Sequence, residues 1–141
     1  MTTHPGAKMT VEEVNTFLAT EFLGSGGLCA EIGPTFAVSR LHAGEQNLRP
    51  GSIISGPTIF SLCDSALYFA VFGAIGFEPM ALTSELSIRF LRPAQGTDVI
   101  ARADLDHIGR RSIIGTVRVS MADAPQRLVA TAQGTYVRPQ H

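Results

Sequence analysis

Asp64 is the side chain of this sequence best suited to chemistry. It is the only charged residue between Ile53 and Phe77, and its neighbours three and four positions away are apolar or small. An unpaired buried carboxylate costs several kcal/mol, and a chain that keeps one usually has a use for it. The alternative is a structural aspartate that is satisfied by Ser61, Ser65 or a backbone amide. We interpret Asp64 as a functional carboxylate.

The segment Ser55-Gly56-Pro57 begins the helix, predicted over residues 57–72, that carries Asp64. Proline is favoured in the first turn, because the amide at that position has no partner within the helix. The first amides of a buried helix point outward unpaired and attract developing negative charge, so this end is suited to serve as an oxyanion hole. Gly56 would let a ligand approach the backbone closely. An ordinary transition from loop to helix has the same residues, so both interpretations stay open here.

The elements that position these groups follow from the hydrophobic pattern. Thr10 and Glu13 form a capping box that begins a short amphipathic helix, which ends at Gly24-Ser25-Gly26-Gly27. Residues 28–43 predict two short strands around a turn at 33–34. A helix over residues 57–72 has apolar side chains on every face, which predicts that it is enclosed.

The C-terminal half changes its period to two. Alternating apolar residues predict four half-buried strands, at 82–90, 99–105, 113–121 and 128–136. Short turns predict that consecutive strands pair antiparallel as a meander, and Thr83 falls on the polar face of its strand. The fold class is α+β, with five to six antiparallel strands curled around the long helix. The whole chain, 1–141, forms one domain, in which residues 1–9 are a loose tail.

Composition excludes several classes of function. The chain has 141 residues, is 45% hydrophobic and 16% charged, and carries a formal net charge of −1. The lack of basic excess argues against a nucleic-acid partner. Cys29, Cys63 and four scattered histidines show no metal-ligand spacing, which predicts no metal and two reduced thiols. Asp64, the Gly56-Pro57 interruption and the absence of flanking basic clusters argue against a membrane span. No signal peptide is evident, so a cytoplasmic location is expected.

Several motifs together resemble the hotdog-fold thioesterases of the PaaI type, over roughly residues 47–137. They are Asn47, the run 55–66, Thr83, the run 88–94 and Gly109-Arg110. The family pattern has an Asn, a His-Gly-Gly turn, a carboxylate eight residues after the first glycine, a Ser or Thr opening the next strand, and a Phe-Leu-Arg-Pro-like run. Gly56 and Asp64 match that interval. Ser55-Gly56-Pro57 departs from the His-Gly-Gly turn, and Pro57 cannot supply an amide.

The resemblance implies a hotdog fold, homodimers or dimers of dimers, and hydrolysis of acyl-CoA thioesters at sites shared between two subunits. Asp64 would be the general base or the nucleophile, and the two routes stay open. Gly56 would donate its amide to the thioester oxygen, Asn47 would orient the thioester or the water, and Thr83 would hold the water against Asp64. The expected substrate-binding residues are Ser55, Phe60, Tyr68, Arg92 and Arg110, the two arginines at the phosphates of coenzyme A. No cofactor is expected besides the coenzyme A of the substrate.

Two other functions are considered. A non-catalytic module that binds acyl thioesters is suggested by Ser55 and Pro57, which replace the usual turn. Hydration of enoyl-CoA is disfavoured, because that chemistry needs a carboxylate and a histidine, and no histidine lies between Asn47 and Thr83.

Overall fold

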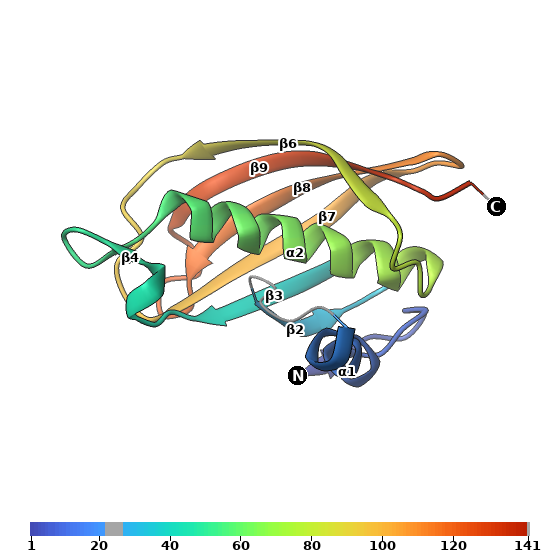
Figure 1. Ribbon diagram of the computed structural model, residues 1–141, viewed down its shortest axis with the longest axis horizontal. Helices are drawn as coiled ribbons and strands as arrows, with labels where there is room; N and C mark the ends of the chain where they lie inside the picture. Colours follow the sequence, from blue (N-terminus) through green and yellow to red (C-terminus); the bar gives the residue numbers. More distant parts are fainter. Residues whose placement is uncertain (22–26, 141) are drawn as a thin grey trace.

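A long helix, α2 (Gly56–Ile75), lies against one face of a seven-stranded sheet in the computed structural model, which describes residues 1–21 and 27–140 (Figure 1). The sheet order is β1-β2-β3-β7-β8-β9-β6. Its strands are β1 (Thr2–Thr3), β2 (Leu28–Ile32), β3 (Phe36–His42), β6 (Leu82–Phe90), β7 (Asp98–Ile108), β8 (Ser112–Met121) and β9 (Leu128–Val137). The remaining elements are α1 (Val11–Glu21), the 3-10 turn η1 (Glu45–Asn47) and the short hairpin of β4 (Leu48–Arg49) and β5 (Ile53–Ile54). The predicted α+β class and the wrapped central helix are confirmed. The sheet has seven strands and not the predicted five to six antiparallel ones, because β1 adds to its edge in parallel.

The residues at the two ends of helix α2 explain where it begins and ends. Ser55 caps it by accepting a hydrogen bond from the Thr58 amide at 3.3 Å, and Gly76 ends it at a φ of 91°, which favours glycine. Residues 66–73 are buried on all sides, as predicted. The first half is not enclosed, since Phe60 is 41% exposed and Asp64 is half-buried. By length and composition alone α2 could span a membrane, but most of its side chains are buried in the protein core.

The order of the strands differs from the predicted meander. β7, β8 and β9 follow one another as expected, but β6 pairs with β9 at the far edge of the sheet and not with β7. The connection from β6 to β7, residues 91–97, is too long for a tight hairpin turn and passes the N-terminal end of α2 (Figure 1). The long free edge of β6 therefore borders the first half of the helix.

The N-terminal segment is not a loose tail. β1 pairs in parallel with β2, the His4 amide donates to the Ile32 carbonyl at 2.8 Å, and the Lys8 amide donates to the Gly73 carbonyl at 2.9 Å. The reason is that the outer edge of β2 offers unpaired backbone groups, which the segment covers. The capping box of Thr10 and Glu13 is confirmed at 2.9 and 3.1 Å. Helix α1 is described up to Glu21, and of the segment predicted to end it, residues 24–27, only Gly27 lies among the described residues.

Replacement of Gly73 by alanine should destabilise the fold although alanine is the better helix former. A Cβ at this position would clash with the Gly33 carbonyl oxygen, and that backbone cannot move without shifting β2 and β3. We expect a loss of about 1–3 kcal/mol, measured as a lowered midpoint of thermal unfolding. Gly56→Ala is the matched control, because its Cβ would meet only Phe90 at 3.4 Å. Equal midpoints for the two variants would contradict this packing.

Candidate functional site

The Asp64 carboxylate is held by two neutral donors from the sheet. The Thr83 hydroxyl donates to Oδ1 at 2.7 Å, and the Tyr136 hydroxyl donates to the same oxygen at 2.6 Å. Tyr136 also donates to the main-chain carbonyl of Asp64 at 3.1 Å. Within the described part of the chain Asp64 has no ion pair, and its Oδ2 has no hydrogen-bond partner. The carboxylate is therefore fixed in orientation with one oxygen available for chemistry.

Thr83 reaches Asp64 because of a β-bulge. Thr83 pairs with Tyr136 and Glu85 pairs with Thr135, so Ser84 is an extra residue in β6. A bulge reverses the alternation of side chains, and Thr83 therefore faces the helix although simple alternation placed it on the polar face. Its hydroxyl donates directly to the carboxylate. The role that the resemblance implied, holding a water against Asp64, stays a prediction.

Tyr136 is a site residue that the sequence analysis missed. It is buried on β9, and burial together with the neighbouring Asp64 charge raises the pKa of its phenol, so it remains a protonated donor. Its ring stacks on Tyr68 at 5.8 Å between centroids, and Tyr68 in turn donates to the Pro79 carbonyl at 2.8 Å. The available signal was a tyrosine on the apolar face of a strand, because a buried phenol requires a hydrogen-bond partner.

Replacement of Tyr136 by phenylalanine should lower the rate of a reaction that depends on the Asp64 carboxylate by about tenfold. The Tyr136 hydroxyl is one of the two donors that hold Oδ1 of Asp64, so without it the carboxylate is less firmly oriented. Tyr68→Phe is the matched control, since the Tyr68 hydroxyl donates to the Pro79 carbonyl. An unchanged rate in Tyr136→Phe would rule out this role.

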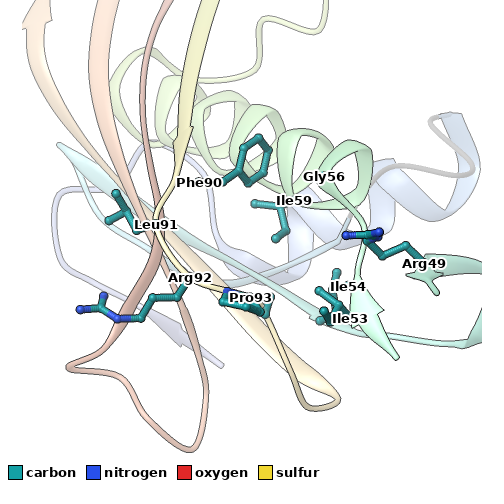
Figure 2. A pocket seen from close by; sticks show the side chains of 10 residues that line it. Arg49, Ile53, Ile54, Gly56, Ile59, Phe90, Leu91, Arg92 and Pro93 are labelled. Atoms are coloured by element: carbon teal, nitrogen blue, oxygen red, sulfur yellow. The ribbon is translucent and has the colours of Figure 1, made fainter. Parts of the chain in front are cut away.

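The N-terminus of α2 borders a cavity of about 380 Å³ (Figure 2). It is lined by Arg49, Ile53, Ile54, Gly56, Ile59, Phe90, Leu91, Arg92, Pro93 and Ala94. The Gly56 amide has no hydrogen-bond partner among the described residues. Asn47 lies beside it, because the Asn47 carbonyl accepts from the Ser55 amide at 2.8 Å. The Asn47 side chain accepts from the Gly44 amide at 2.9 Å through Oδ1, which leaves its NH₂ group as a donor.

The expected substrate-binding residues do not gather around this cavity. Ser55 Oγ is engaged in the helix cap, at 3.3 Å from the Thr58 amide and 2.8 Å from the Thr58 hydroxyl. Tyr68 is buried behind Tyr136. Arg110 lies in the turn between β7 and β8, at the Thr83 end of the sheet, whereas Arg92 lies at the cavity end.

Arg49, and not Arg92, points into the cavity. Arg92 donates to the Leu128 carbonyl at 2.7 Å, and its guanidinium extends away from Gly56 (Figure 2). Arg49 extends from β4 toward the space between Gly56 and Ile54 (Figure 2). No sequence pattern distinguished Arg49 from other loop arginines, so it was missed.

Asp64 and Gly56 of one chain cannot act on the same carbonyl group. They lie eight residues apart on one helix, a separation of about 12 Å along its axis. A base and an oxyanion donor must each lie within about 3 Å of their atoms on the reacting group. These two groups of one chain therefore lie at separate positions, which we call the Asp64 half-site and the Gly56 half-site.

Thiol and metal chemistry find little support near Asp64. Cys63 is buried, and burial raises the pKa of its thiol to about 12, so the nucleophilic thiolate is scarce at neutral pH. Across residues 1–21 and 27–140, no three His, Cys, Asp or Glu side chains are grouped as metal ligands. The carboxylate of Asp64 is therefore the candidate reactive group at this position.

Comparison with known proteins identifies the family. The sequence model of the Thioesterase superfamily matches residues 51–133, which include Gly56, Asp64 and Thr83. The chain belongs to the thioesterase superfamily. Membership supports thioester hydrolysis as the class of activity of this thioesterase, and it confirms the family predicted from the sequence. A search of curated proteins found no match.

Solved structures confirm the hotdog fold of this thioesterase. Conserved protein PA5202 from Pseudomonas aeruginosa is 29% identical, with a TM-score of 0.72 over 79% of this chain and 86% of that one. The E. coli PaaI protein from the phenylacetic acid degradation operon is 24% identical, with a TM-score of 0.72 over 90% and 91%. Thioesterase HI1161 from Haemophilus influenzae is 16% identical, with a TM-score of 0.81 over 94% and 93%.

Proposed function

We propose that this thioesterase hydrolyses acyl-CoA thioesters to a free acid and coenzyme A, with Asp64 as the reacting side chain. The observation that carries the proposal is the carboxylate that Thr83 and Tyr136 hold through Oδ1, with Oδ2 available. As a general base, Oδ2 takes a proton from the water that attacks the thioester carbonyl. As a nucleophile, Oδ2 attacks that carbonyl itself, and water then hydrolyses the mixed anhydride. Both routes use the same oriented oxygen.

The oxyanion that forms on the carbonyl needs a donor from outside the Asp64 half-site. The Gly56 amide of a second copy supplies it, an interaction worth about 10²–10³ in rate. Asn47, whose main-chain carbonyl accepts from the Ser55 amide, orients the thioester through its side-chain NH₂ group. Pro57 contributes no amide, so this oxyanion site has one backbone donor fewer than the His-Gly-Gly turn would provide.

The second copy is proposed to pair with its α2 antiparallel to the first. If Gly56 of each chain lies opposite Asp64 of the other, the two-fold axis passes beside the residue midway between them, Phe60. Phe60 is 41% exposed in the single chain, and β6 beside it offers a free edge with Phe90 and Leu82 52% and 63% exposed. Apolar side chains along an unpaired strand edge favour association. This arrangement completes two equal sites per dimer, and a dimer of dimers would hold four.

The reaction needs only water and the groups named above. We therefore propose no metal and no cofactor beyond the coenzyme A of the substrate. We also propose that the enzyme is cytoplasmic. A hydratase is not proposed, because no histidine contacts Asp64 in the described part of the chain.

The direct test is thiol release from a panel of acyl-CoAs of different chain length. Steady release by the purified protein supports hydrolysis. The replacement of the second glycine by Pro57 favours one rival, a module that binds acyl thioesters without hydrolysing them. That rival predicts saturable binding of acyl-CoA by calorimetry without release of thiol, and this result would overturn the proposed activity.

A further inference from the structure

The cavity beside Gly56 has positive charge without a compensating acid. Its lining includes Arg49 and Arg92 but no Asp or Glu, and the first turn of α2 has no acidic residue. The positive end of the helix dipole points to the same place. The other walls are apolar, from Ile53, Ile59 and Phe90 among others. A ligand that fits this cavity combines an apolar body with a negative group.

Arg49 is the side chain placed to bind that negative group. The guanidinium of Arg40 pairs with Asp98 and that of Arg102 with Asp104, whereas Arg49 has no ion pair or side-chain hydrogen bond in the described structure. It extends toward the cavity, while Arg92 is tied to the Leu128 carbonyl (Figure 2). A guanidinium fork binds a carboxylate through two parallel hydrogen bonds.

We propose that the cavity binds the acyl part of the substrate and that Arg49 selects acyl groups ending in a second carboxylate, so that the preferred substrate is the CoA thioester of a short dicarboxylic acid. This inference rests on the proposed function, which places the thioester carbonyl at Gly56. Arg49 and Gly56 line the same cavity, whose volume of about 380 Å³ is near the small end of known ligand sites, roughly 300–1,000 Å³. The phosphates of coenzyme A lie farther from the thioester, beyond the pantetheine arm.

The first arm of the test compares glutaryl-CoA with pentanoyl-CoA, which have equal chain length but differ in the terminal carboxylate. Wild type should prefer glutaryl-CoA in kcat/KM. Arg49→Gln should lower kcat/KM for glutaryl-CoA by about 10- to 100-fold and leave that for pentanoyl-CoA nearly unchanged. Arg49→Lys keeps the charge without the fork and should restore part of the loss. Arg118→Gln is the control for net charge, because Arg118 is exposed on β8 and does not line the cavity.

The second arm separates the acyl carboxylate from the phosphates. The N-acetylcysteamine thioesters of the same two acids lack the coenzyme A phosphates. If Arg49 binds the acyl carboxylate, Arg49→Gln lowers hydrolysis of the glutaryl thioester in both carriers. If Arg49→Gln lowers both CoA thioesters equally and neither N-acetylcysteamine thioester, Arg49 binds a phosphate and the inference is wrong. No change with any substrate would also overturn it.

A binding measurement tests the role of Arg49 independently of whether the protein hydrolyses the thioester. In the Asp64→Asn background, calorimetry should show tighter binding of glutaryl-CoA than of pentanoyl-CoA, and adding Arg49→Gln should remove the difference. If wild type releases no thiol from any thioester while this preference holds, the proposed hydrolysis fails and the role of Arg49 stands. Equal affinity for both thioesters in the two backgrounds overturns the role of Arg49 whether or not hydrolysis occurs.

Discussion

Replacement of Asp64 by asparagine should lower kcat/KM for acyl-CoA hydrolysis by about 10²–10⁴-fold. Asparagine has nearly the same shape, and its carbonyl oxygen can still accept from Thr83 and Tyr136 in place of Oδ1. What it loses is an oxygen that takes a proton from water or attacks the thioester. The fold should therefore remain while the chemistry is lost. The measurement is thiol release at saturating and limiting acyl-CoA, with the thermal midpoint of each protein beside it.

The matched control is Asp123→Asn, which removes the same charge from an exposed turn between β8 and β9. It should leave kcat/KM unchanged. Equal rates for wild type and Asp64→Asn would show that the carboxylate takes no part in the reaction. The asparagine variant is preferable to alanine, because alanine also removes the acceptor of two hydrogen bonds, and a stability loss would then obscure the result.

The individual helices and strands were predictable, because the period of the apolar residues and the helix-capping residues are signals that lie within a few positions of one another in the sequence. The capping box at Thr10, the helix after Pro57 and the four C-terminal strands all lie within a few residues of their predicted positions. The place of β6 in the sheet was not predictable in this way. Strand order depends on which edge a connection can reach, and no short-range pattern in residues 91–97 encodes the partner.

The site was predicted in part for the same reason. Asp64 stood out because a lone carboxylate among apolar residues is visible in sequence. The direction of Thr83 depends on one bulge residue, Ser84, and strict alternation gives the opposite face. Tyr136 contacts Asp64 from 72 residues away. Arg49 lines the same cavity as Gly56 only because the β4–β5 hairpin folds beside the helix. Such contacts exist only in the folded chain.

Mixing two nearly inactive variants, Asp64→Asn and Gly56→Pro, should restore activity if two chains complete each site. Gly56→Pro removes the amide proposed to bind the oxyanion, and proline is tolerated in the first helical turn because that amide has no helical partner. In a mixed dimer one site combines the intact Asp64 of one chain with the intact Gly56 of the other, and the second site carries both lesions. Random subunit exchange makes half of the dimers mixed, and each mixed dimer has one intact site of two. The mixture should therefore reach about a quarter of wild-type activity.

The control for this experiment is a mixture of Asp64→Asn with Asp64→Ala, in which every site lacks the carboxylate whatever the pairing. It should stay as inactive as its components. Subunit exchange is verified by a size tag on one variant, so that mixed dimers are counted directly. If mixed dimers form and activity does not rise, Asp64 and Gly56 do not serve the same site. The oxyanion donor would then be a group other than Gly56. The alternative, in which Asp64 and Gly56 of a single chain act on one carbonyl, is excluded because they lie about 12 Å apart along α2.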